Sequence, residues 1–184
     1  MNLILFGVSN VGKSVTGQLL ATKLGFDFYD LDEQVKEFMG ISLEQFVHTG
    51  SLFYRDQIRC QLVNSITKTK ANKVLAVTPL SHIKDIEHLF SSDDTLAILL
   101  QDSAQHIFDR LVFSDENDRI YKDDEYKNQH RAYYISEIKD DIAWYGRIYS
   151  KIKNKFDMDG NPPEVVVEQL IRKYHLNRNE KTGE

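Results

Sequence analysis

The stretch Gly7-Val-Ser-Asn-Val-Gly12-Lys13-Ser14 decides the fold, because it matches the phosphate-loop pattern G-x-x-x-x-G-K-S at every fixed position. An apolar run, Asn2-Leu-Ile-Leu-Phe6, precedes it and predicts a buried parallel strand. Apolar residues at helical spacing follow it and predict a helix over residues 13–24. Strand, loop and helix stand in the order that phosphate binding requires, so the stretch predicts a site for a nucleoside triphosphate.

Each fixed residue of this loop has a task in binding phosphate. Glycines let backbone N–H groups curl around the β-phosphate at the N-terminus of the helix. Lys13 neutralises charge between the β- and γ-phosphates, and the Ser14 hydroxyl is a magnesium ligand. A nucleoside triphosphate and Mg²⁺ are therefore the expected ligands of this loop. The loop residues expected at the nucleotide are Gly7, Asn10, Val11, Gly12, Lys13, Ser14 and Val15.

Away from the loop, short apolar runs alternate with helical patterns. Further strands are expected at residues 26–29, 73–77, 96–100 and 155–158. Helices are expected at residues 31–39, 43–47, 52–66, 83–90, 104–111, 131–153 and 163–174. Alternating strands and helices predict an α/β fold, a three-layer α/β/α sandwich with a central parallel sheet. One domain of the P-loop kinase type, residues 1–176, is expected to precede a polar tail at 177–184.

Residues 113–130 differ in composition from their surroundings. Residues 114–118 and 122–125 are polar and charged, with almost nothing to bury. Such a segment between regular elements is typical of a mobile functional loop, so we interpret it as a lid.

Composition excludes several classes of protein. The net charge of −5, with both signs interspersed, argues against a nucleic-acid surface. Cys60 is the only cysteine, so no intrachain disulfide can form. No apolar run approaches the ~20 residues of a membrane helix, and no signal peptide is evident. A cytoplasmic protein is expected, a monomer that acts on a small molecule without nucleic-acid or membrane partners.

A small GTPase is one alternative, because Asn154-Lys-Phe-Asp157 matches N-K-x-D and Asp157-Met-Asp-Gly160 matches D-x-x-G. The two motifs share Asp157, whereas in a GTPase they are separate elements with D-x-x-G first. We interpret both matches as coincidence.

Two motifs after the loop resemble the shikimate kinase family. Asp30-Leu-Asp32 is similar to the family's D-x-D, and Gly50-Ser-Leu-Phe-Tyr-Arg55 to its G-E-x-x-F-R. The resemblance implies that Asp30 supports the magnesium shell through water, while Asp32 binds substrate hydroxyls and accepts the proton of the attacking one. It implies that Arg55 grips a substrate carboxylate. The alternatives are that the acidic pair caps a helix and that Arg55 is solvated.

The resemblance continues into the lid and beyond. Arg110 lies where the family has a nucleotide-contacting arginine, and Arg119 takes the place of the catalytic arginine in R-P-L-L, although Ile120-Tyr121 follows it here. A lid arginine stabilises developing charge on the phosphates. Asn161, in Asp157-Met-Asp-Gly-Asn-Pro162, is expected near the adenine.

Two departures concern the substrate site. The family has three glycines after its third strand, where this chain has Thr78-Pro79-Leu80, and Pro79 offers no N–H. Thr78 and Pro79 are expected to line the substrate cleft. The family's R-x-P-L-Y arginine falls near Tyr145, and Arg147 is displaced from it by two residues.

The resemblance implies an ATP-dependent kinase that transfers the γ-phosphoryl group to a hydroxyl of a small metabolite, the 3-hydroxyl of shikimate. Two alternatives stay open. The acceptor could be another hydroxylated acid, or the chain could be a nucleotide-binding regulator without kinase activity.

Overall fold

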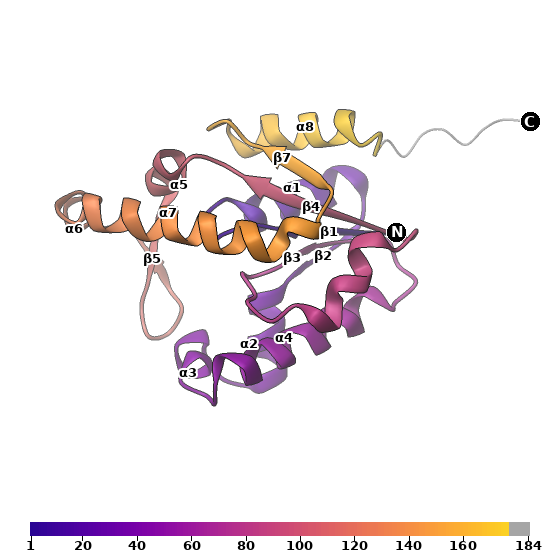
Figure 1. Cartoon of the computed structure of the whole chain (residues 1–184), viewed down its shortest axis with the longest axis horizontal. Coiled ribbons are helices and arrows are strands. Elements are labelled where there is room, and N and C mark those ends of the chain that lie inside the picture. The colour runs from indigo at the N-terminus through magenta and orange to yellow at the C-terminus, as the bar shows by residue number, and fades with distance from the viewer. Residues whose placement is uncertain (177–184) are drawn as a thin grey trace, which may run out of the picture.

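Strand β1 (Asn2–Phe6) forms the centre of a parallel sheet in the computed structural model, which describes residues 1–176 (Figure 1). The sheet has five strands in the order β2-β3-β1-β4-β7. Its other strands are β2 (Asp27–Asp30), β3 (Lys73–Ala76), β4 (Thr95–Gln101) and β7 (Asn154–Asp157). All four pairings are parallel, which confirms the predicted sheet.

Alternating side chains of β1 fill two cores, one on each face of the sheet. Leu3 and Leu5 pack beneath helices α1 (Lys13–Leu24) and α8 (Pro163–Lys173). Ile4 and Phe6 face the opposite layer, which contains α4 (Leu52–Thr67) and the 3-10 helix η1 (Lys84–Ser91). Each buried side chain of this kind contributes roughly 1.5–3 kcal/mol relative to exposure. The predicted three-layer sandwich is therefore confirmed.

A third, smaller core lies beside the sheet. Helices α2 (Leu31–Met39) and α3 (Leu43–Val47) pack with α4 around Val35, Phe46 and Ile58. This unit begins directly after β2, so it stands at the carboxyl ends of the strands, where open α/β sheets bind ligands.

The segment expected to be a lid contains regular structure. Strands β5 (Phe113–Ser114) and β6 (Ile120–Tyr121) form an antiparallel hairpin, and α6 (Asp124–Gln129) follows. Phe113 contacts the rings of Tyr121, Tyr126 and Tyr134 at centroid distances of 5.7 to 5.9 Å. Residues 114–118 and 122–125 include no buried residue, as expected, and Tyr121 and Tyr126 of the ring cluster remain about half exposed.

Two helices join the lid to the sheet. Helix α5 (Ala104–Arg110) leads into the hairpin, and the long helix α7 (Arg131–Ile148) returns from it, as Figure 1 shows. The predicted helix over residues 131–153 ends early, because the chain tightens into the 3-10 helix η2 (Tyr149–Lys151) before β7. The predicted tail at 177–184 lies outside the described residues. No helix within residues 1–176 could cross a membrane.

Candidate active site

Backbone geometry requires the glycines of the loop between β1 and α1. A Cβ on Gly7 would lie 2.7 Å from the carbonyl oxygen of Leu100, and its φ is +147°. Gly12 has a φ of 112° where it caps α1. Asn10 also adopts a positive φ, at 58°, a conformation that asparagine tolerates better than most residues. The loop therefore turns tightly against the end of β4 before α1 begins.

Lys13 is held against its own loop. Its Nζ donates to the carbonyl oxygen of Val8 at 2.7 Å, and the residue is only 8% exposed. Burial lowers the pKa of Lys13 to about 8, although the nearby carboxylates Asp32 and Asp30 act in the opposite direction. A bound phosphate would favour the charged form of Lys13, so anion binding would raise the pKa of this lysine.

A polar cleft of about 220 Å³ opens beside this lysine. It is lined by Ser9, Asn10, Lys13, Ser14, Asp30, Asp32, Ala76, Thr78 and Pro79. The structure thus brings together the two residues predicted as magnesium ligands, the predicted base and both residues predicted from the third strand's loop. These come from β2, β3 and the phosphate loop, whose parallel strands end at the same edge of the sheet.

The two carboxylates of this cleft have different surroundings. Asp30 caps α2, since its Oδ1 accepts the backbone N–H of Asp32 at 3.0 Å. Asp32 accepts a hydrogen bond from the Thr78 hydroxyl at 2.5 Å through Oδ2. Burial raises the pKa of Asp32, and the bond from Thr78 opposes that rise. Capping explains one member of the acidic pair and leaves Asp32 oriented toward the cleft.

A larger cleft of about 820 Å³ lies on the other side of the loop. Gly12 to Val15 form one wall, and the predicted nucleotide residues Arg110 and Asn161 line it. Val11 is fully buried behind the loop. Arg119 is exposed in the hairpin and is not among the lining residues of either cleft, so its catalytic role stays a prediction.

Two lysines of the lid line this larger cleft although the sequence did not single them out. Lys122 follows β6, and Lys127 lies on α6 with its Nζ 5.4 Å from the Phe108 ring centroid. A lysine within a charged segment cannot be assigned to a binding site from the sequence pattern alone. Only the fold of the hairpin turns these two toward the phosphate loop.

Asp102 joins three elements around the larger cleft. Its Oδ2 accepts from Arg110 at 2.5 Å, and its Oδ1 lies 2.6 Å from Nδ1 of His106. The backbone N–H of Gly160, beside Asn161, also donates to this carboxylate at 3.3 Å. Burial raises the pKa of Asp102, but the hydrogen bonds from Arg110, His106 and the backbone N–H of Ser103 outweigh it and the pKa is lowered. Asp102 therefore fixes the positions of Arg110 and the loop after β7.

Replacing Asp102 with asparagine is expected to weaken ATP binding about tenfold, with a much smaller change in kcat at saturating ATP. The amide keeps one acceptor oxygen but loses the charged pairing with Arg110, and hydrogen bonds to charged groups are worth roughly 1.5–3 kcal/mol. Calorimetric titration with ATP measures the change. Asp93→Asn, in an exposed turn, is the matched control. Unchanged ATP affinity in a folded Asp102→Asn protein would contradict this role.

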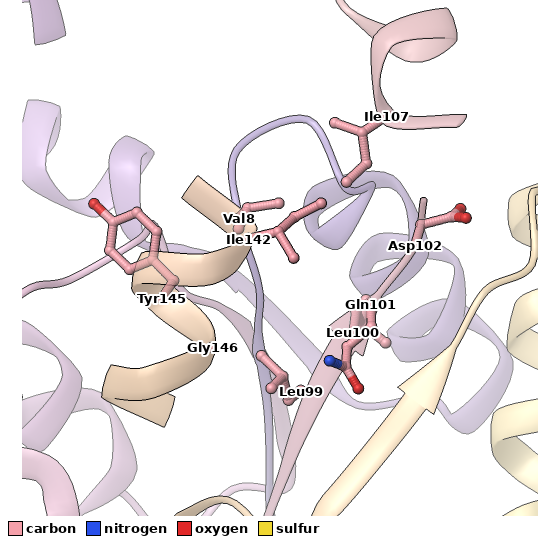
Figure 2. A pocket seen from close by; sticks show the side chains of 9 residues that line it. All are labelled: Val8, Leu99, Leu100, Gln101, Asp102, Ile107, Ile142, Tyr145 and Gly146. Carbon is pink, nitrogen blue, oxygen red and sulfur yellow. The ribbon is translucent and has the colours of Figure 1, made fainter. Parts of the chain in front are cut away.

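A small cavity behind the phosphate loop is separate from both clefts. Its volume is about 70 Å³. Figure 2 shows residues of β4 and α7 and Val8 around it. This is the space of a few water molecules, so it cannot hold a metabolite. The Tyr145 ring forms one wall, and Figure 2 shows its hydroxyl directed away from Val8 and Ile142.

Two adjoining clefts around a phosphate loop, with a carboxylate in the smaller one and lid cations over the larger, define a P-loop kinase. The family model for shikimate kinase matches residues 9–175, and this chain belongs to that family. A shikimate kinase from Thermodesulfovibrio yellowstonii is 28% identical over 182 residues, covering 98% of this chain and 99% of the relative.

Solved structures show the same fold. Shikimate kinase from Bacteroides thetaiotaomicron gives a TM-score of 0.75 at 17% identity, covering 95% of this chain and 98% of that one. Shikimate kinase from Acinetobacter baumannii, solved in complex with shikimate, gives 0.65 at 20% identity, covering 97% and 95%. The N-K-x-D match lies on β7, where Asn154 donates to the Ala97 carbonyl oxygen at 3.1 Å.

Proposed function

We propose that this kinase transfers the γ-phosphoryl group of ATP to the 3-hydroxyl of shikimate. The observation that carries the proposal is the shared cleft of Lys13 and Asp32, in a chain of the shikimate kinase family. The relative solved in complex with shikimate supports the choice of acceptor. The nucleotide enters the larger cleft and the acceptor the smaller one, so that the phosphate loop lies between them.

Catalysis then rests on positioning and charge. Asp32 orients the acceptor hydroxyl and takes its proton as the oxygen attacks phosphorus. Lys13 leaves the Val8 carbonyl and neutralises charge on the transferred group. The Ser14 hydroxyl and Asp30, which face one cleft, fit an ion held by few protein ligands together with phosphate and water. Mg²⁺ held there would offset the charge of the β- and γ-phosphates.

Thr78→Val should move the acidic limb of the kcat/KM profile to higher pH. The Thr78 hydroxyl stabilises ionised Asp32, so removing it raises the pKa of that carboxyl further. A base must be deprotonated to act, so activity falls on the acid side and is kept at high pH. The pH profiles of the wild type, Thr78→Val and Thr78→Ser provide the test. Serine keeps the hydroxyl and should keep the native profile; an unshifted valine profile would contradict the account.

A different hydroxylated acid is the second candidate acceptor. The observation that favours it is Thr78-Pro79-Leu80 at the position where the family has three glycines. Incubating the protein with Mg·ATP and a panel of hydroxylated acids, followed by phosphorus NMR of the product, separates the candidates. Phosphate on the 3-hydroxyl of shikimate supports the first proposal. A product only from another acid supports the second, and nucleotide binding without any product supports a regulator.

The remaining expectations are also proposals. We propose that the kinase unit comprises residues 1–176 with residues 113–130 as its lid, and that the protein works as a monomer in the cytoplasm, where ATP is supplied. Sedimentation of the purified chain tests whether it is a monomer, since a dimer would appear at twice the 21.4 kDa mass of the monomer.

A further inference from the structure

The loop after β3 has its backbone donors occupied by protein groups. The Leu80 N–H donates to the hydroxyl of Tyr149 at 2.7 Å, and Pro79 has no N–H. The N–H groups of Ser81 and His82 both donate to Oδ2 of Asp56 at 3.0 Å. From residue 79 to residue 82, no backbone amide is left for a substrate. An anionic group on the acceptor must therefore be bound by side chains.

Arg59 offers such a side chain close to this loop. It is 8% exposed, and its Nε has no hydrogen-bond partner among residues 1–176. Its one ion pair is to Oδ1 of Asp56 at 3.5 Å, beyond the distance of a good hydrogen bond. A guanidinium carries five N–H donors, and the buried Nε donor of this cation is left without an acceptor. Buried charges are normally paired, and an arginine in this state suits a ligand anion.

Arg55 lies one helical turn before Arg59, and residues four apart share a helix face. Its Nη1 donates to the carbonyl oxygens of Thr49 and Gly50 at 3.2 and 3.0 Å, which fixes the side chain. Its Nε is also buried without a partner among residues 1–176. Helix α4 thus presents two arginines that each keep a free donor.

The surroundings of Arg59 place it near the reacting groups. Its guanidinium lies 5.1 Å from the Phe46 ring centroid, and Asp56 links it to residues 81 and 82. Its charge also acts to lower the pKa of two groups outside α4, Asp32 and Tyr145, although burial raises both pKa values overall. Arg59 therefore lies within electrostatic reach of the catalytic carboxylate and of α7.

We propose that Arg59 binds the carboxylate of the acceptor beside Arg55, for which the family resemblance already implies that contact, and that Arg59 determines specificity for an acid. The proposal rests on the proposed function, because it places the carboxylate of the same acceptor whose hydroxyl faces Asp32. The two arginines, one helical turn apart, would then bind the carboxylate. In this chain a triple-glycine loop and an arginine at position 145 are not available for that contact, because Thr78-Pro79-Leu80 and Tyr145 stand there. The Tyr145 hydroxyl points away from the small cavity in Figure 2. It interacts with Ser81, beside this site.

The test compares shikimate with its methyl ester, which keeps the hydroxyls and removes the negative charge. Affinity is measured by calorimetry with Mg²⁺ and a non-hydrolysable ATP analogue, and KM by ADP release. Arg59→Met should weaken binding of shikimate about tenfold to a hundredfold and leave the ester within about twofold. Arg59→Lys should restore part of the preference for the acid. Arg172→Met, an exposed arginine on α8, is the matched control.

Removing Arg59 alone leaves Asp56 buried without its counter-ion, which can unfold the protein. The double variant Asp56→Asn/Arg59→Met removes both charges, and the asparagine oxygen can still accept from residues 81 and 82. It should lose the preference for the acid as the single variant does.

The outcomes separate this proposal from the proposed function. A wild-type preference for shikimate over its ester that survives in folded Arg59 variants would overturn the role of Arg59 and leave the function intact. Binding of shikimate without phosphorylation would overturn the function alone. A wild-type protein that binds neither compound would overturn both.

Discussion

Replacing Lys13 with alanine is expected to reduce kcat/KM for phosphoryl transfer roughly 10³-fold. The transferred group carries charge on three oxygens, and in this protein the loop supplies one buried cation next to it. In the free enzyme this lysine has a pKa lowered to about 8 by burial. The affinity of the wild type for ATP should therefore fall as pH rises through about 8, because the free enzyme loses the proton that phosphate binding needs.

Steady-state kinetics and ATP titrations from pH 6.5 to 9.5 test both statements, with the pH values chosen to bracket that pKa. In Lys13→Ala the dependence of ATP affinity on pH should be lost along with turnover. Lys139→Ala, exposed on α7, serves as the control and should behave as the wild type. Turnover retained within tenfold in Lys13→Ala would show that the loop lysine does not stabilise the transferred phosphate.

Asp32→Asn is expected to lower kcat by roughly 10²- to 10⁴-fold, the usual contribution of general acid–base catalysis. The asparagine has the same size and can still accept the hydrogen bond from Thr78, so the cleft should keep its shape. Affinity for ATP should change by no more than about threefold, because we propose that the nucleotide binds in the other cleft. Rapid-quench measurement of a single turnover isolates the chemical step.

Glu33→Gln, on the same helix, is the matched control for this variant. Glu33 pairs with Lys36 on the surface of α2 and lies outside both clefts. Losses of equal size in ATP affinity and in kcat for Asp32→Asn would mean that this carboxylate organises the phosphate loop and does not act on the acceptor.

Much of the fold could be predicted because its signals are local. The helix expected at 13–24 is observed at those bounds, since apolar spacing defines its start and Gly25 ends it with a left-handed φ of 64°. The strand expected at 2–6 is also observed at those bounds, because a strand buried on both faces is a continuous apolar run in the sequence. The helix expected at 83–90 is observed as a 3-10 helix, and residues 113–130 contain a hairpin and a helix. In both places the outcome depends on packing against distant elements.

The site divides in the same way. Lys13, Ser14, Asp30 and Asp32 could be found from sequence, because a short motif or a fixed distance from it identifies them. Asp102 and Lys127 could not, because they contact backbone groups 58 and 18 residues away, the N–H of Gly160 and the carbonyl oxygen of Asp109. Arg59 could not be found from sequence either, because its burial depends on tertiary packing, whereas an arginine on an amphipathic helix is usually exposed.

The most direct test of shikimate phosphorylation is release of ADP from Mg·ATP by the purified chain, measured with and without shikimate. We expect slow release alone and a large, saturable stimulation by shikimate, with one phosphorylated product formed for each ADP. ATP binding in the same sample without any stimulation by shikimate would contradict it, and the Thr78-Pro79-Leu80 loop would then mark a site built for a different acceptor.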